Sequence, residues 1–177
     1  MTDTTKVTAA ACTWRDEGGG EAAAARILPF LEEIGIEVDW IGEAKEQLLD
    51  GLAIVNGRIL IDPDTPVWPG DLLHEAGHIA AVPPEDRATL GPLEADATDE
   101  MVAIAWSYAA SLPCELPLRQ LFHDGGYRGD SAKLRTSFAT GHFIGAPMLG
   151  VYGMTADLRT ALAEGKPAFP SLSRWLR

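Results

Sequence analysis

The stretch DLLHEAGHIAA, residues 71–81, places two of the chain's four histidines on either side of a glutamate. On a helix, His74 and His78 project from the same side one turn apart, and this spacing lets two imidazoles bind one tetrahedral metal ion. Glu75 lies too far round the helix to complete that ligand set comfortably, but it can reach a water at an open coordination position and act as general base. The pattern therefore predicts a hydrolytic metal site, and zinc is the ion that best suits such ligands.

A catalytic zinc site needs a third protein ligand, and the segment after the motif offers four acidic residues. Glu100 has the strongest physical case, because it opens a predicted helix whose same-face neighbours are small and allow close packing on another helix. Glu94 is nearer to the motif in sequence but lies in an irregular loop. Asp96 and Asp99 are further alternatives, and any of the four could simply stabilise a helix N-terminus. We therefore expect Glu100 to complete the ligand set, with Glu94 as the main alternative.

Attack of water on a carbonyl develops a negative charge that usually needs a hydrogen-bond donor besides the metal. His142 is favoured for this role, because the glycines around it would let a backbone approach a cleft. His123, Tyr127 and Tyr152 are alternatives, and each of the four could equally be a structural side chain. The segment around His123, FHDGGYRGD, is not a phosphate loop, since it lacks the lysine and the preceding strand.

The elements that must position these residues can be predicted from hydrophobic periodicity and turn residues. The stretch LAIVNGRILI, 52–61, predicts a β-hairpin, because both residues of its Asn56-Gly57 turn need positive φ. The motif itself predicts a helix over 69–81, which Pro83-Pro84 would end. The other predicted elements are a helix over Glu21–Ile34 with Pro29 inside it, a strand in IEVDWI (36–41), a short helix over 43–50, a long helix over Asp99–Leu112, helical stretches near 115–123 and 130–140, and a helix over 155–165 with Thr155 as N-cap and Gly165 as C-cap.

Together these elements predict an α+β fold with a small mixed or antiparallel sheet, a helix that carries the motif, and a mainly helical C-terminal half. Residues 1–20 are expected to be a flexible segment and residues 21–177 a single domain. The apolar stretch 145–154 is expected to be flexible and to serve core packing or an oligomer contact rather than the site.

Composition and charge exclude several classes of protein. The chain is 46% hydrophobic and 23% charged, with a formal net charge of −12. Its 14 Lys and Arg are scattered rather than gathered in a basic stripe, so nucleic-acid binding by this chain alone is disfavoured. Cys12 and Cys114 form no disulfide framework, which fits a reducing compartment. No stretch reaches the roughly 20 apolar residues of a membrane span. We expect a cytoplasmic protein, whose oligomeric state stays open.

The order of these segments resembles the ImmA/IrrE-type zinc metallopeptidases over about residues 24–113. A helix, EEIGIEV, the hairpin IVNGRILIDP, LLHEAGHIA and a helix opened by a glutamate follow one another. The second helix of that family has the pattern Glu-x-x-Ala-x-x-aromatic, and Glu100-Met-Val-Ala103-Ile-Ala-Trp106 is similar to it. The HExGH motif is the specific part of this match, and nothing after about Leu118 matches the family.

The resemblance implies a zincin-like core, in which a short sheet lies beside the active-site helix. It implies that His74, His78 and Glu100 bind Zn²⁺ and that Glu75 is the catalytic acid/base. It also implies cleavage of a protein target, often a transcriptional repressor.

Three functional hypotheses follow from the motif. The leading one is a zinc-dependent peptidase that hydrolyses a protein or peptide substrate. The alternative is a non-catalytic metal-binding regulatory or interaction domain on the same scaffold, which would bind metal without turnover. A domain whose motif binds nothing would contain no stoichiometric metal. Glu75 favours the peptidase, because metal binding alone would not require it.

Overall fold

The computed structural model describes residues 6–42, 50–92 and 96–177. Its sheet contains β1 (Val38–Trp40), β2 (Leu52–Val55) and β3 (Arg58–Ile61) in the order β1-β3-β2. The predicted hairpin is confirmed: β2 and β3 are antiparallel, and Asn56 and Gly57 between them have φ of 52° and 71°. Because β1 pairs with β3 in parallel, the sheet is mixed.

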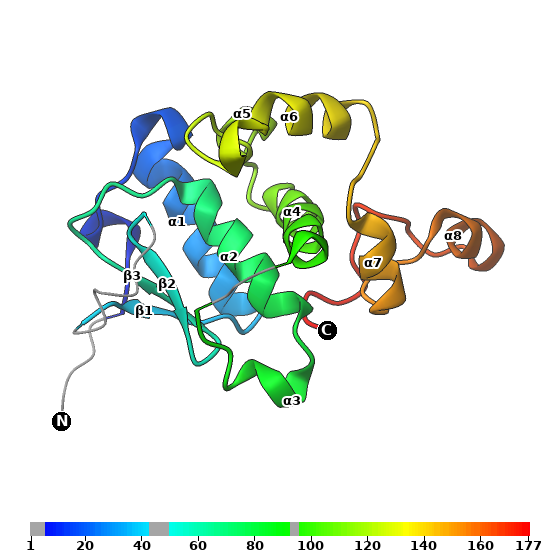
Figure 1. The fold of residues 1–177 in the computed structure, drawn as a ribbon, viewed down its shortest axis with the longest axis horizontal. Coiled ribbons are helices and arrows are strands. Elements are labelled where there is room, and N and C mark those ends of the chain that lie inside the picture. The colour runs from blue at the N-terminus through cyan, green and yellow to red at the C-terminus, as the bar shows by residue number, and fades with distance from the viewer. Residues whose placement is uncertain (1–5, 43–49, 93–95) are drawn as a thin grey trace.

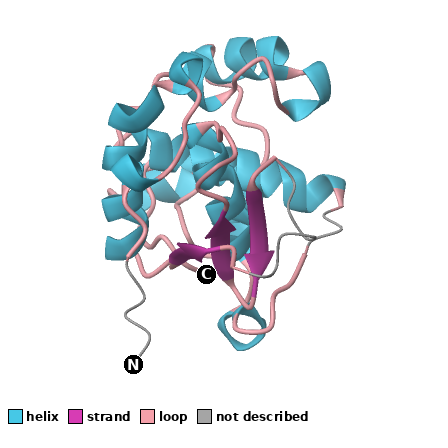
Figure 2. Cartoon of the chain, turned by 90° about the vertical axis from the view of Figure 1, so that its left-hand side faces the viewer, coloured by secondary structure: helices cyan, strands magenta, loops and turns pink. Residues whose placement is uncertain are grey.

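Two helices pack against each other and against this sheet (Figures 1 and 2). Helix α1 (Gly20–Glu33) runs through Pro29 without a break, and α2 (Pro69–Ala81) matches the predicted motif helix. Their buried apolar side chains meet those of the central strand β3. The fully buried members of this core include Ile27, Leu31, Ile59, Ile61, Leu72 and Ile79.

The remaining regular elements of the described residues are helices, which confirms the α+β class and the mainly helical C-terminal half. Helix α4 (Ala97–Ser111) lies beside α2, and the helices that follow α5 (Leu118–Leu121) lie away from the sheet (Figure 1). No helix in the three described ranges is both long and apolar enough to cross a membrane. The remaining helices are α3 (Pro84–Arg87), α4 (Ala97–Ser111), α5 (Leu118–Leu121), α6 (Ser131–Ala139), α7 (Ala146–Val151) and α8 (Leu158–Glu164), with the short 3₁₀ helices η1 (Ala9–Ala11), η2 (Asp16–Gly18) and η4 (Tyr127–Gly129).

The N-terminal segment differs from the expected loose one in its described part, residues 6–20. Trp14 is buried, and its indole donates to the Ala9 carbonyl at 2.7 Å. The backbone around Trp14 pairs with Val67, just before α2, through two hydrogen bonds of 2.9 and 3.1 Å. These contacts join the segment to the core at a point more than 50 residues along the chain, which local periodicity does not predict.

Two predictions about the C-terminal part were wrong in detail. The N-cap of α8 is Asp157 rather than Thr155, because the Asp157 carboxylate accepts a hydrogen bond from the Thr160 amide at 2.9 Å. The Thr155 hydroxyl instead donates to the Ser171 carbonyl at 2.7 Å. Gly165 is the C-cap as predicted, with φ of 66°.

The stretch 145–154 contains α7, which was not predicted. The predicted helix over 43–50 falls, except for its last residue, outside the described ranges.

The contact between α7 and α4 makes Gly145 a sensitive position. Gly145 has φ of 85°, and a Cβ atom there would lie 2.0 Å from the Met101 carbonyl oxygen. We expect Gly145→Ala to lower the free energy of unfolding by about 2–4 kcal/mol, through backbone strain and overpacking. Gly141→Ala is the matched control, because Gly141 has φ of 81° but open space around it. Denaturant titration should show the larger loss for Gly145→Ala; equal losses would exclude the packing contribution.

The two cysteines are free, and their burial predicts slow thiol chemistry. Burial raises the pKa of the Cys114 thiol from 9.0 to about 12 and that of Cys12 to about 11. Since alkylation needs the thiolate, at pH 8 the shift at Cys114 lowers the reactive fraction roughly a thousandfold, tenfold for each pKa unit. We expect iodoacetamide at pH 8 to leave Cys114 unmodified in the folded protein and to modify it in urea, as measured by mass spectrometry. Equal labelling rates in the two states would contradict this.

Candidate metal centre

Helix α2 presents a stripe of polar side chains toward α4. Its N-terminus is set by Pro69 at the first helical position and by Asp71 in the first turn, both favourable there. Asp71, His74 and His78 are spaced by three and four residues and therefore share one face. The other faces of the helix are largely buried in the core. The packing of α2 thus fixes the direction in which both imidazoles point.

Helix α4 brings Glu100 to the same place. The helix begins at Ala97, two residues earlier than predicted, because the Asp96 carboxylate caps it by accepting hydrogen bonds from the next amides. The two helices approach closely at Gly77, where a Cβ atom would lie 2.8 Å from the Ala103 carbonyl oxygen. Ser107 is buried on α4 but donates to the Ile104 carbonyl of its own helix. The small-residue packing expected for α4 is therefore present.

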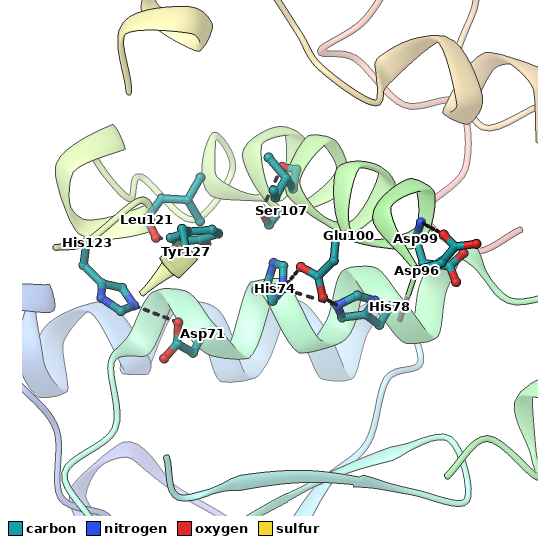
Figure 3. Close-up of polar contacts among 11 residues, drawn as sticks. Asp71, His74, His78, Asp96, Asp99, Glu100, Ser107, Leu121, His123 and Tyr127 are labelled. Carbon is teal, nitrogen blue, oxygen red and sulfur yellow. Dashed lines mark hydrogen bonds and ion pairs between the residues drawn. The ribbon is translucent and has the colours of Figure 1, made fainter. Parts of the chain in front are cut away.

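The ligand atoms of His74, His78 and Glu100 converge between the two helices (Figure 3). The two imidazole Nε2 atoms are 3.2 Å apart. Glu100 places Oε2 3.3 Å from the His74 Nε2 and Oε1 3.4 Å from the His78 Nε2. Ligands of a tetrahedral ion at 2.0–2.1 Å would be separated by about 3.3–3.4 Å. The two imidazole nitrogens are close to this spacing, and each lies near a different oxygen of Glu100, so this His-His-Glu group could hold a metal ion.

The charges of the group favour a cation. The adjacent imidazoles hold the pKa of Glu100 well below its usual range, so the carboxylate is ionised. Burial alone would lower the pKa of His74, but the hydrogen bond with Glu100 and the negative charges of Glu75 and Asp71 raise it. The His74 Nδ1 is buried and has no hydrogen-bond partner among the described residues.

Glu75 lines the same cleft as these three side chains. It makes no hydrogen bond or ion pair with another described residue. Burial raises its pKa, although the neighbouring imidazoles of His74 and His78 oppose this shift. A carboxyl group whose pKa is moved toward neutrality is suited to accept and return a proton. Glu75 therefore combines the location and the acidity of a general base.

The cleft over this group has a volume of about 600 Å³. One wall is strand β2, whose residues Leu52, Ala53 and Ile54 are part of the lining. The floor is formed by α2 and α4, and the segment Gly125–Arg128 forms another part of the lining. Of the alternative oxyanion donors, Tyr127 lies here: its ring meets the His74 imidazole edge-on, at 5.5 Å between centroids. Burial and the nearby carboxylates raise the pKa of Tyr127 well above 10, so its hydroxyl stays protonated.

The structure does not bring His142 to this cleft. Its side chain is exposed between α6 and α7, where Nδ1 lies 3.1 Å from the Thr140 hydroxyl. The expected role of His142 as a donor in the site therefore has no support in the structure. Tyr152 is also outside the cleft lining, and its ring packs under the Arg177 guanidinium at 3.8 Å.

The acidic alternatives to Glu100 lie elsewhere or outside the described ranges. Asp96 is engaged as the α4 cap, and Asp99 is exposed on the first turn of that helix (Figure 3). Glu94 lies outside the described residues. Within the described ranges, Glu100 is the carboxylate that joins the two histidines.

Asp71 and His123 lie near the site, and their pairing was not predicted from the sequence. Asp71 precedes His74 and His78 by three and seven residues, a spacing that would have placed it on the metal-facing stripe. It binds His123, one of the alternative donors, with 2.7 Å between His123 Nε2 and Asp71 Oδ1 (Figure 3). Because the two residues are 52 positions apart in the chain, this pairing could not be predicted from local spacing.

Comparisons of the chain with protein-family models, with curated proteins and with solved structures found no match. We therefore infer a function from the residues of this cleft and from their geometry.

Proposed function

We propose that this chain is a zinc-dependent peptidase with a zincin-like fold, similar to the ImmA/IrrE-type metallopeptidases. The observation that carries the proposal is the convergence of His74, His78 and Glu100, with 3.2 Å between the two Nε2 atoms and a carboxylate oxygen of Glu100 3.3 or 3.4 Å from each, and with Glu75 in the same cleft. Two imidazoles and a carboxylate form the ligand set of several catalytic zinc sites, which leave one coordination position open.

In this proposal His74, His78 and Glu100 hold the ion. When bound, zinc supplies Lewis acidity, which polarises a substrate carbonyl and makes a nearby water more acidic. Glu75 accepts a proton from the attacking water and passes it to the leaving amine, which is why its raised pKa is useful. Tyr127 lines the cleft and His142 does not, but the Tyr127 hydroxyl donates to the Leu121 carbonyl at 3.3 Å and would have to give up this bond to donate to a substrate oxygen.

A peptide is the substrate that best fits the shape of the cleft. Strand β2 is at the edge of the sheet, because the strand order is β1-β3-β2, and three of its residues line the cleft. An extended peptide can add to such an edge through main-chain hydrogen bonds. Its scissile bond would then lie between β2 and the helix that carries Glu75.

The proposal is tested by incubating the zinc-loaded chain with a peptide library derived from a proteome and identifying new termini by mass spectrometry. We expect cleavage that a chelator abolishes and that added zinc restores. Stoichiometric zinc without any cleavage would contradict the peptidase and favour the metal-binding regulatory domain. Absence of bound metal would contradict both.

A further inference from the structure

The loop that forms one wall of the cleft is anchored to α2 through a buried histidine. His123 is only 2% exposed, and its Nε2 lies 2.7 Å from the Asp71 Oδ1. Asp71 is one turn before His74 on the same face of α2 (Figure 3). Any segment bound at Asp71 is therefore held directly beside the first predicted metal ligand.

His123 is held by further contacts besides the bond to Asp71. On one side it stacks on Trp68, with ring centroids 4.0 Å apart and an angle of 3° between the planes. Gly126 approaches so closely that a Cβ atom there would lie 2.9 Å from the His123 Cε1. The Ser131 hydroxyl donates to the His123 carbonyl at 2.6 Å and closes the loop behind the ring. The imidazole therefore has one defined position.

Space filling alone does not account for a histidine at this position. Its Nδ1 is buried and has no hydrogen-bond partner among the described residues. A buried polar atom without a partner is unfavourable for stability and calls for another explanation. An apolar ring could stack on Trp68 equally well, but it could not bind Asp71. The hydrogen bond to α2 is thus the property that distinguishes histidine here.

The segment that follows is held in a strained backbone conformation. Tyr127 and Arg128 are consecutive non-glycine residues with φ of 54° and 50°, in the left-handed region that side chains disfavour. Such conformations persist only where surrounding contacts impose them. His123 anchors one side of the strained pair, and Ser131 closes the other. The Tyr127 hydroxyl also donates to the Leu121 carbonyl at 3.3 Å, and in this position its ring lies edge-on to the ring of His74.

We propose that Asp71 and His123 form a clasp that positions the Gly125–Arg128 wall, and through Tyr127 the imidazole of His74, at the metal centre. The proposal rests on the proposed metal site and assigns positioning rather than catalytic roles to both residues. His74 is then fixed between two rings, those of Tyr127 and His78, at 5.5 and 4.8 Å between centroids. Loss of a residue that orients a metal ligand without binding the metal itself typically weakens metal affinity 10- to 100-fold.

The test uses the full chain loaded with Co²⁺, whose visible absorption bands report ligand geometry. We expect His123→Ala to bind Co²⁺ and Zn²⁺ about 10- to 100-fold more weakly than wild type in chelator competition, with altered absorption bands. His123→Gln, whose amide can still donate to Asp71, should restore part of the affinity. Leu149→Ala is the matched control, because Leu149 is fully buried in α7 and does not line the cleft.

A merely structural role would make His123→Ala resemble Leu149→Ala, with lower thermal stability but unchanged metal affinity and absorption bands, and this result would overturn the clasp. Hydrogen exchange on the metal-free chain provides an independent readout. We expect His123→Ala to accelerate exchange of the Gly125–Arg128 amides more than Leu149→Ala does, and equal rates would overturn the clasp. Because exchange needs no metal, failure of the clasp and failure of the metal site are distinguishable.

Discussion

Purified wild-type chain supplied with zinc is expected to contain about one zinc ion, and His78→Ala and Glu100→Ala are expected to lose it. Each substitution removes one of the three side chains whose ligand atoms converge. Because His78 and Glu100 contact each other, each substitution also leaves the other side chain without this contact. Because losing even a supporting residue costs roughly 10- to 100-fold in affinity, loss of a ligand should exceed that range. Elemental analysis after gel filtration measures the content directly.

Substitution of other acidic residues distinguishes binding at this site from non-specific binding of cations to an acidic chain. Asp99→Ala removes a carboxylate from the same first turn of α4 that carries Glu100, and it should keep the metal. Glu94→Ala should also keep it. Zinc should raise the thermal midpoint of wild type, since a ligand that binds only the folded state stabilises it, and it should not do so for His78→Ala. Wild-type chain that stays metal-free in excess zinc would contradict the site and leave the motif as a helix surface.

The parts of this site that sequence predicts are those encoded locally. The His74 and His78 pair depends only on helical spacing, and the ends of α2 follow from Pro69 and from the prolines after Ala81. The hairpin follows from Asn56-Gly57, whose positive φ values are observed. Each of these features depends only on residues that are close together in the sequence.

Glu100 is an intermediate case. Its distance from the motif in sequence says nothing about proximity, but the small residues on its helix face predicted close packing with another helix. The approach of Gly77 to Ala103 shows that this packing occurs between α2 and α4. The close packing predicted for the Glu100 helix is thus observed, while the role of Glu100 as a metal ligand stays a prediction.

Other features depend on contacts between distant segments and escaped prediction. The burial of Trp14 requires Val67, and the Asp71–His123 pair spans 52 residues. His142 was favoured because of adjacent glycines, yet glycines signal backbone freedom rather than location, and the chain carries this residue to an exposed turn. Tyr127 had no better local signal than His142, and only the folding of the loop onto α2 distinguishes the two.

Glu75→Gln is expected to keep the metal and to lose catalysis. The amide preserves the shape of the side chain, and Glu75 is not among the three converging ligands, so zinc content should equal that of wild type. The amide cannot accept the proton of the attacking water, and loss of a positioned general base typically lowers turnover by about 100- to 10,000-fold. The measurement is the initial rate of cleavage of a peptide from the library experiment, at equal zinc content.

Glu75→Asp is the informative companion to that variant. It keeps a carboxylate but withdraws it by one methylene from the cleft, so an intermediate rate is expected if Glu75 acts by proton transfer, because such transfer depends on hydrogen-bond reach. Glu75→Gln with wild-type turnover would exclude Glu75 as the base and leave the metal ligands as the only supported part of the mechanism. Loss of zinc in Glu75→Gln would instead place Glu75 in the ligand set, which the separation of its side chain from the converging atoms argues against.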